Sequence, residues 1–165
     1  MEKKLIHGVV IKPLRVIPDE RGRLMEILRC DDDVFEKFGQ VYMTSAYPGV
    51  VKGWHYHRLQ TDHFAVVKGM IKLVLWDGRD PALGYGYEGD PSPTANMVNE
   101  FFMGMHNPVL VKIPRMVMHG MKAVGEEEAI VINVPTMPYR HGDPDEYRVH
   151  PHENNIPYDW SAKDG

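Results

Sequence analysis

Short apolar runs, each bounded by glycine, proline or aspartate, are the feature that most limits the folds open to this chain. Runs of this length and composition are typical of β-strands, and we predict strands at residues 9–16, 41–46, 63–67, 71–76, 109–113 and 129–134. Lys68-Gly69-Met70 forms a tight turn that joins two of them into a hairpin. One short helix is predicted at residues 31–38, where an aspartate can cap the first turn. Together these elements predict an all-β jelly-roll sandwich or barrel.

Composition indicates an ordinary globular protein with few unusual partners. A length of 165 residues, 43% apolar and 25% charged, fits a single domain over residues 1–165. The net charge of −4 and the lack of a basic cluster argue against nucleic acid as a main partner. The single cysteine, Cys30, excludes an intrachain disulfide and favours the reducing cytoplasm. We find no signal-like segment and no stretch long enough to span a bilayer, so no membrane partner is expected.

One irregular segment, at residues 80–97, interrupts the strand pattern. It is rich in glycine and proline, and a loop this long in a compact domain is usually functional or disordered. Tyr85 and Tyr87 could stack on a planar ligand group. A mobile surface insert is the alternative, and the residues do not decide between the two.

Four residues have a spacing that suits a metal site. His55 and His57 project to the same face if their segment is a strand, and Asp62 would return to them from the next strand. His119 comes from a separate segment further along the chain. Three imidazoles and one carboxylate suit a divalent metal such as zinc, iron, manganese or nickel. The alternative is that these histidines are surface residues or hydrogen-bonded residues of the core.

The same spacing resembles the cupin superfamily. Its first motif is a glycine, five residues, HxH, three or four residues, Glu, six residues and a glycine, and Asp62 stands here in place of the glutamate. Its second motif is P-x-G-x-x-H, in which Pro114 and His119 match and Met116 replaces the glycine. This resemblance implies a jelly-roll fold in which the four residues meet.

A second, narrower resemblance covers nearly the whole chain. Its segments read PDERGRLME at 18–26, KGWHY at 52–56, WDGR at 76–79, IPRMVMHGM at 113–121, and DPDEYR and IPYDW at 143–148 and 156–160. In this order they are similar to D-x-R-G-x-F-x-E, R-G-L-H-Y, V-D-x-R, I-P-x-G-x-x-H-G-F and W-x-D-P…I-x-W of the dTDP-4-dehydrorhamnose 3,5-epimerases. That family inverts the two carbons beside the ketone of a nucleotide-linked 4-keto-6-deoxyhexose. The resemblance implies a homodimer that needs no cofactor.

Inversion beside a ketone proceeds through an enolate, so it needs a base, an acid and a group that stabilises the enolate oxygen. By resemblance, His55 stands at the family's base, and Glu153 at the acid that orients it. Asp77 and His119 match a second Asp–His pair near the sugar. We therefore expect these four residues in a catalytic site.

Substrate contacts are also implied by the resemblance. Arg21, Glu26 and Lys52 sit where the family contacts its nucleotide sugar, with Lys52 replacing an arginine. His57 replaces a glutamine that follows the H-Y pair. Tyr85, on the irregular loop, is added as a stacking residue. The expected partner is a nucleotide-diphosphate sugar.

Two family residues are replaced. The lysine that supports the oxyanion aligns with Asp62, and the tyrosine that donates a proton aligns with Ile132. Nearby Tyr139 is the substitute donor we consider. A metal held by His55, His57, Asp62 and His119 could take over the lysine's task, because a Lewis acid stabilises the same charge. A metal-bound His55, however, would not be free to act as the base.

Three functions therefore stay open. The first is an epimerase of the isomerase class, acting on a nucleotide-linked keto-sugar in deoxysugar and polysaccharide biosynthesis. The second is a metal-dependent cupin enzyme that acts on a small polar substrate. The third is a non-catalytic sugar-binding cupin. We favour the first, because its resemblance spans the chain.

Overall fold

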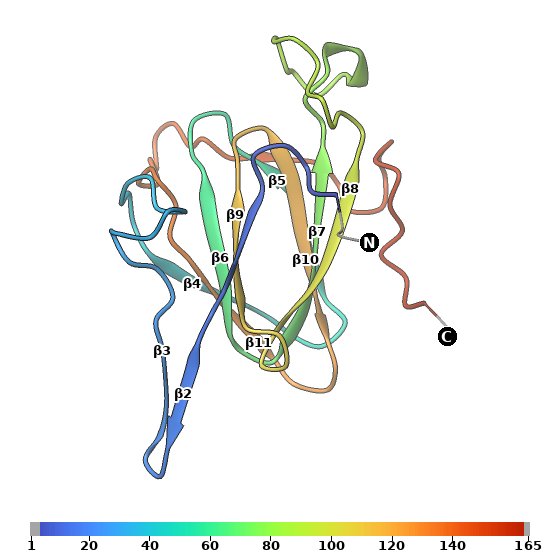
Figure 1. Cartoon of the computed structure of the whole chain (residues 1–165). Coiled ribbons are helices and arrows are strands. Elements are labelled where there is room, and N and C mark those ends of the chain that lie inside the picture. Colours follow the sequence, from blue (N-terminus) through green and yellow to red (C-terminus); the bar gives the residue numbers. More distant parts are fainter. Residues whose placement is uncertain (1–3, 164–165) are drawn as a thin grey trace.

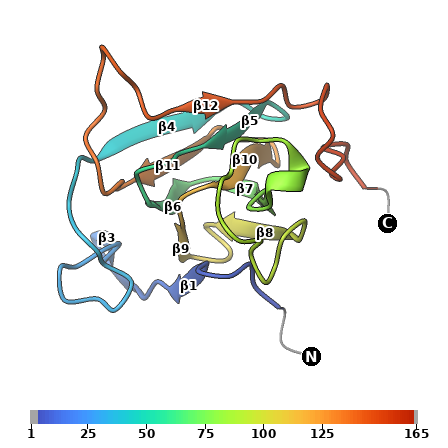
Figure 2. The same ribbon diagram turned by 90° about the horizontal axis from the view of Figure 1, so that it is seen from above.

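The computed structural model describes residues 4–163 and contains two antiparallel five-stranded sheets packed face to face (Figures 1 and 2). The first sheet has the order β1 (Val10–Pro13), β9 (Val109–Ile113), β6 (Asp62–Lys68), β11 (Ala129–Asn133) and β4 (Tyr42–Ala46). The second has the order β12 (Tyr147–Arg148), β5 (Val51–Tyr56), β10 (Val117–Val124), β7 (Met70–Asp77) and β8 (Val98–Gly104). The predicted jelly-roll fold class is confirmed.

Strand β7 shows how the sequence builds the two apolar layers. Its alternate residues Ile71, Leu73 and Leu75 enter the core between the sheets. The other face, with Val74 and Trp76, packs in a second cluster with Trp160 of the C-terminal segment. Because both faces are covered, the strand is a continuous apolar run instead of an alternating one.

Each of the six predicted strand segments contains an observed strand, but one is divided. Strand β1 ends at Pro13, and β2 (Val16–Asp19) then leaves the sandwich to pair only with β3 (Gly22–Met25). This hairpin projects from the body of the molecule (Figure 1). Strand β5 was expected only through the shared face of His55 and His57, and β8 and β10 were not predicted, because glycines, histidines or other polar residues interrupt their apolar pattern.

The predicted helix at 31–38 is wrong. That segment forms turns, and the one helix within residues 4–163 is a short 3₁₀ turn, η1 (Pro81–Leu83). The Asp32 carboxylate accepts the backbone N–H of Arg29 and pairs with Lys12, so it closes a turn instead of starting a helix. Val34 is buried, and its carbonyl accepts a hydrogen bond from His63 Nε2 at 3.0 Å. Within the same range, no helix is long and apolar enough to cross a membrane.

Candidate active site

A cavity of about 890 Å³ opens on the side of the sandwich where β4, β5 and β12 lie close together (Figure 2). Strands β5 and β10 of one sheet and β4 of the other contribute to its wall. The chain that follows β11 completes it. The lining includes five of the predicted site residues, which are Lys52, His55, His57, His119 and Tyr139.

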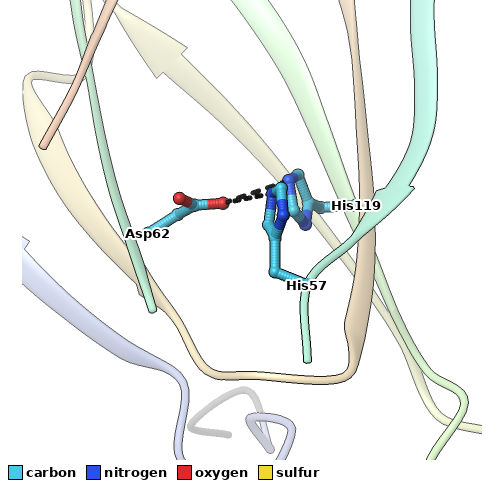
Figure 3. Close-up of side chains that lie close together, drawn as sticks. All are labelled: His57, Asp62 and His119. Atoms are coloured by element: carbon cyan, nitrogen blue, oxygen red, sulfur yellow. Dashed lines mark ion pairs between the residues drawn. The ribbon is translucent and has the colours of Figure 1, made fainter. Parts of the chain in front are cut away.

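Beside this cavity, His57, Asp62 and His119 converge from three elements (Figure 3). His57 follows β5, His119 lies on β10, and Asp62 begins β6 in the opposite sheet. Asp62 Oδ2 is 3.2 Å from His57 Nε2 and 3.4 Å from His119 Nε2. The ligand atoms of all three residues lie within 4.8 Å of one another. Three of the four side chains expected to meet, those of His57, Asp62 and His119, do so.

The Asp62 carboxylate is buried, and its two oxygens have different partners. Oδ1 accepts hydrogen bonds from Gln60 Nε2 and Asn133 Nδ2, each at 2.9 Å. Oδ2 faces the two imidazoles. The hydrogen bond from His57 lowers the pKa of Asp62 although its burial opposes ionisation. Asp62 is therefore an anion with one oxygen fixed and the other directed at the histidines.

Backbone carbonyls fix the tautomers of the two histidines. His57 Nδ1 bonds the carbonyl of Asp145, and His119 Nδ1 bonds that of Val117 at 3.2 Å. A carbonyl only accepts, so each Nδ1 carries a proton, and a neutral ring then presents the lone pair of Nε2. Burial lowers the pKa of His119 to about 4, so this ring is neutral. Burial opposes protonation of His57 too, but contact with Asp62 raises its pKa.

His55 occupies a separate place in the same cavity. Its Nε2 lies 3.9 Å from a carboxylate oxygen of Glu146, and its ring centroid lies 6.1 Å from that of His119. Burial lowers the pKa of His55 and outweighs the opposite effect of Glu146. His55 is thus a neutral imidazole outside the three-residue cluster.

The orienting acid predicted at Glu153 is corrected to Glu146. Glu153 lies on an exposed turn, where its backbone N–H donates to His150 Nδ1, and it does not line the cavity. Glu146 lies between His55 and Arg148, which it also contacts at 2.5 Å. The sequence did not predict this contact, because Glu146 lies on irregular chain after β11. The alternation of residues that predicts strands gives no information on the path of such a segment.

Asp77 is not part of an Asp–His pair with His119, contrary to the prediction. Its buried carboxylate binds the Arg79 guanidinium at 2.7 and 2.9 Å and accepts from the hydroxyls of Ser92 and Thr94. These contacts tie the loop at 80–97 to the end of β7. Asp62 is the carboxylate beside His119.

The remaining predicted substrate residues differ in position. Lys52 lines the cavity and donates to Thr44 Oγ1 at 2.9 Å. Tyr85 packs edge-on against Trp76, with ring centroids 5.1 Å apart, outside the cavity. Arg21 pairs with Asp19 at the end of the β2–β3 hairpin, and Glu26 pairs with Arg29. Neither Arg21 nor Glu26 lines the cavity of its own chain.

Sequence reasoning also missed Tyr42 and Asn133. Tyr42 begins β4, lines the cavity and lies opposite Asn133 of β11 in the strand register. Asn133 is fully buried, and its amide contacts both Tyr42 and Asp62. A usable signal was present, because Asn133 is a polar residue within an otherwise apolar run. Ile132, at the family tyrosine position, does not line the cavity.

Comparisons with known proteins agree with this architecture. The sequence model named Polysaccharide biosynthesis C-terminal domain matches residues 17–80. The probable low-salt glycan biosynthesis epimerase Agl13 of Haloferax volcanii is 39% identical, over 96% of both chains. A solved dTDP sugar isomerase of Desulfovibrio desulfuricans G20 is 34% identical, covers 96% of this chain and 94% of its own, and has a TM-score of 0.85. A solved dTDP-4-dehydrorhamnose 3,5-epimerase from Sulfolobus tokodaii is 26% identical, with coverage of 96% and 86% and a TM-score of 0.75.

Proposed function

The chain belongs to the dTDP-4-dehydrorhamnose 3,5-epimerase-like family of cupins, and we propose that it inverts a carbon beside the ketone of a nucleotide-linked 4-keto-6-deoxyhexose. It is an enzyme of the isomerase class that serves deoxysugar or polysaccharide biosynthesis. The observation that carries this proposal is the neutral His55 in the cavity wall, next to Glu146 and outside the three-residue cluster. The position of His55 supports a base separate from the ligand-like residues, which the sequence had placed in one set with it.

His55 acts as the general base in this proposal. Its imidazole lone pair takes the proton from the carbon beside the ketone, and the C–H electron pair forms the C=C bond of an enolate. The carbonyl π electrons move to the oxygen, where charge accumulates. Glu146 favours the imidazolium that results, because it places a carboxylate 3.9 Å from the ring.

Exchange of substrate carbon-bound hydrogen with solvent tests the function. With dTDP-4-keto-6-deoxyglucose in D₂O, we expect the protein to incorporate deuterium beside the ketone. His55→Asn should slow this by roughly 10²–10⁴-fold. His106→Asn, at an exposed position away from the cavity, is the matched control. Unchanged exchange in His55→Asn would reject this base, and no exchange by the unaltered protein with any keto-sugar would favour a sugar-binding module.

Cationic side chains in the cavity favour an anionic ligand. Lys52, Arg58, Arg140 and Arg148 all contribute to the lining, which also includes Asp143, Asp145 and Glu146. Because Arg148 pairs with Glu146, we consider Lys52, Arg58 and Arg140 as the cations for a ligand. The Arg58 guanidinium lies over the Tyr147 ring, 4.6 Å from its centroid. Guanidinium groups bind phosphate oxygens through paired N–H donors. We therefore assign the diphosphate of the nucleotide sugar to this arginine-lined part of the cavity.

A divalent cation is the second proposal, and the cluster of His57, Asp62 and His119 supports it. One ring nitrogen each of His57 and His119 and one carboxylate oxygen of Asp62 lie within 4.8 Å of one another. Their separations of 3.2 and 3.4 Å match the roughly 3.3 Å between ligands of a tetrahedral site with bonds of about 2.0–2.1 Å. The carbonyl partners of both Nδ1 atoms are the usual outer support of metal-bound histidines. The alternative is that a proton on His57, and not a metal ion, balances the negative charge of Asp62.

Zinc, iron, manganese or nickel would suit these ligand types. Such an ion would supply a Lewis acid for the enolate oxygen, the task of the family lysine that Asp62 replaces. The same cation would also serve the alternative function, a metal-dependent cupin enzyme with a small polar substrate. Nucleotide-sugar binding distinguishes that alternative from the epimerase.

We also propose a homodimer built through the β2–β3 hairpin. The hairpin leaves the sandwich and exposes Ile17 and Leu24, which lie opposite each other in its register (Figure 1). A second subunit would cover these apolar side chains. Arg21, at the same hairpin, would then lie near a neighbouring subunit, which agrees with its distance from the cavity of its own chain.

A further inference from the structure

Tyr42 places a phenol in the cavity on the side opposite His55. Tyr42 begins β4 of the first sheet, whereas His55 lies on β5 of the second sheet, and both line the same cavity. Inversion at carbon requires a proton to leave one face and another to arrive at the other face. The two facing sheets thus present a base and a potential acid to the space between them.

Asn133 fixes the direction of the Tyr42 hydroxyl. Asn133 Oδ1 accepts the backbone N–H of His63 at 3.0 Å, so its Nδ2 must be the group directed at Asp62 and Tyr42. Nδ2 donates to the Tyr42 hydroxyl at 2.9 Å. Because this bond occupies a lone pair of the phenol oxygen, the phenolic proton is left to donate elsewhere. The cavity is the space into which this side chain opens.

The surroundings keep that proton on Tyr42 at neutral pH. Burial raises the pKa of Tyr42 to about 12, and the charge of Asp62 acts in the same direction. The hydrogen bond from Asn133 opposes this rise, because it stabilises the phenolate that forms on proton transfer. Tyr42 is therefore arranged to give a proton and to hold the resulting charge briefly.

We propose that Tyr42 is the proton donor that completes the inversion, in place of the family tyrosine that this chain lacks at Ile132. The proposal rests on the proposed epimerase function. After His55 has taken the first proton, the enolate C=C electron pair forms a new C–H bond with the Tyr42 proton on the opposite face. The carbonyl reforms, the Tyr42 phenolate regains a proton from water, and His55 releases its proton to water.

Tyr139 is the competing donor, but its hydroxyl is less well fixed. Tyr139 lines the cavity from the irregular chain after β11 and is 47% exposed, against 38% for Tyr42. Its ring lies edge-on to the exposed His141, with centroids 5.1 Å apart. Within the described part of the chain, its side-chain hydroxyl has no hydrogen-bond partner comparable to Asn133. A proton donor for a defined face of a carbon needs such fixing.

The test separates proton removal from inversion. With dTDP-4-keto-6-deoxyglucose in D₂O, NMR measures both deuterium in the recovered substrate and the epimerised product. For Tyr42→Phe we expect inversion to fall by roughly 10²–10⁴-fold, while exchange with retained configuration persists because His55 is intact. Tyr47→Phe, at an exposed position outside the cavity, is the matched control and should keep both activities. Normal inversion in Tyr42→Phe, or loss of inversion in Tyr139→Phe alone, would overturn the proposal.

The exchange signal also distinguishes other failures. If the unaltered protein shows neither exchange nor inversion, the proposed function fails, not the assignment of Tyr42. If Tyr42→Phe loses both signals but melts normally, Tyr42 acts in binding and the proposal is overturned. Replacement of Tyr42 by 3-fluorotyrosine keeps the hydroxyl. Its phenol is more acidic, so the alkaline limb of the inversion rate should move to lower pH, and an unmoved limb would contradict the role.

Discussion

Asp62 connects the histidine cluster to the pair formed by Asn133 and Tyr42. One oxygen accepts from Asn133, which also holds Tyr42, and the other faces the two histidines. The carboxylate is buried, so its negative charge requires a neighbouring cation or several donors. A change at Asp62 should therefore affect the histidine cluster first and Tyr42 second.

Metal content tests the cation at this residue. Asp62→Asn keeps the shape of the side chain but removes its charge, so we expect at least a 10-fold loss of bound zinc or other divalent metal. Elemental analysis of protein purified without added metal provides the measurement. His55→Asn should keep its metal, because His55 lies outside the cluster. A metal-free unaltered protein would instead assign the balancing charge to a proton on His57.

The sequence predicted the convergence of the histidines better than it predicted their partners. His57 and Asp62 could be placed near each other from strand spacing, and His119 could be placed with them from the resemblance to the cupin motifs. Glu146 and Tyr42 could not, because one lies on irregular chain and the other becomes a neighbour of Asn133 only through strand register. The position of His55 outside the cluster likewise required the structure, since spacing alone put His55 with His57.

At the scale of elements, the loop at 80–97 is attached to strand β7 through Asp77. We expect Asp77→Asn to lower the free energy of unfolding by about 3 kcal/mol, because it leaves the buried end of Arg79 without its carboxylate. Urea unfolding at pH 7 measures this loss. Asp80→Asn is the matched control, because asparagine caps the 3₁₀ turn about as well and the site is exposed. A loss below 0.5 kcal/mol, the size usual for surface changes, would show that the loop is held by other contacts.

The pH dependence of that loss follows from the same contacts. Burial opposes ionisation of Asp77, but Arg79, Thr94 and Ser92 together lower its pKa below the ordinary 3.8. A carboxyl with a depressed folded-state pKa stabilises the protein above the unfolded-state value and loses this effect as pH falls through the folded-state value. The difference in unfolding free energy between the unaltered protein and Asp77→Asn should therefore shrink below pH 3.8. A difference that stays constant into this acidic range would contradict the role of the charge.

Strands were predicted correctly where both faces are covered, so that the residues form an apolar run, or where apolar and polar residues alternate regularly. Strand β7 is apolar throughout because the C-terminal segment covers its outer face. Strand β10 was missed because its sequence, VMHGMKAV, carries a histidine for the site and a glycine at 120. A Cβ at Gly120 would lie 2.8 Å from the Trp160 ring, so close packing requires glycine there. The residues that β10 needs for the site and for packing therefore interrupt the apolar pattern from which a strand is predicted.

At the scale of the whole molecule, the β2–β3 hairpin is the part that a lone chain does not explain. A two-stranded ribbon alone is marginal in water. This one contacts the sandwich through Arg23, which donates to the Val67 carbonyl, and through Met25, but it exposes 43% of Ile17 and 56% of Leu24. The hairpin projects from the sandwich (Figure 1), and about half of each of these two side chains remains exposed. Association with a second copy would bury them and stabilise the hairpin.

Solution mass tests this assembly. The double variant Ile17→Asp with Leu24→Asp places two like charges opposite each other on the hairpin, so we expect it to shift the protein from dimer to monomer. Analytical ultracentrifugation measures the mass, and thermal unfolding checks that the sandwich remains folded. Phe102→Asp, at an exposed apolar position on β8, is the control and should keep the dimer. Both hairpin side chains are already exposed in the single chain, so aspartate at these positions should not unfold it. A folded monomeric double variant would therefore show that the apolar surface of the hairpin serves association. A double variant that keeps the dimeric mass would place the subunit interface elsewhere.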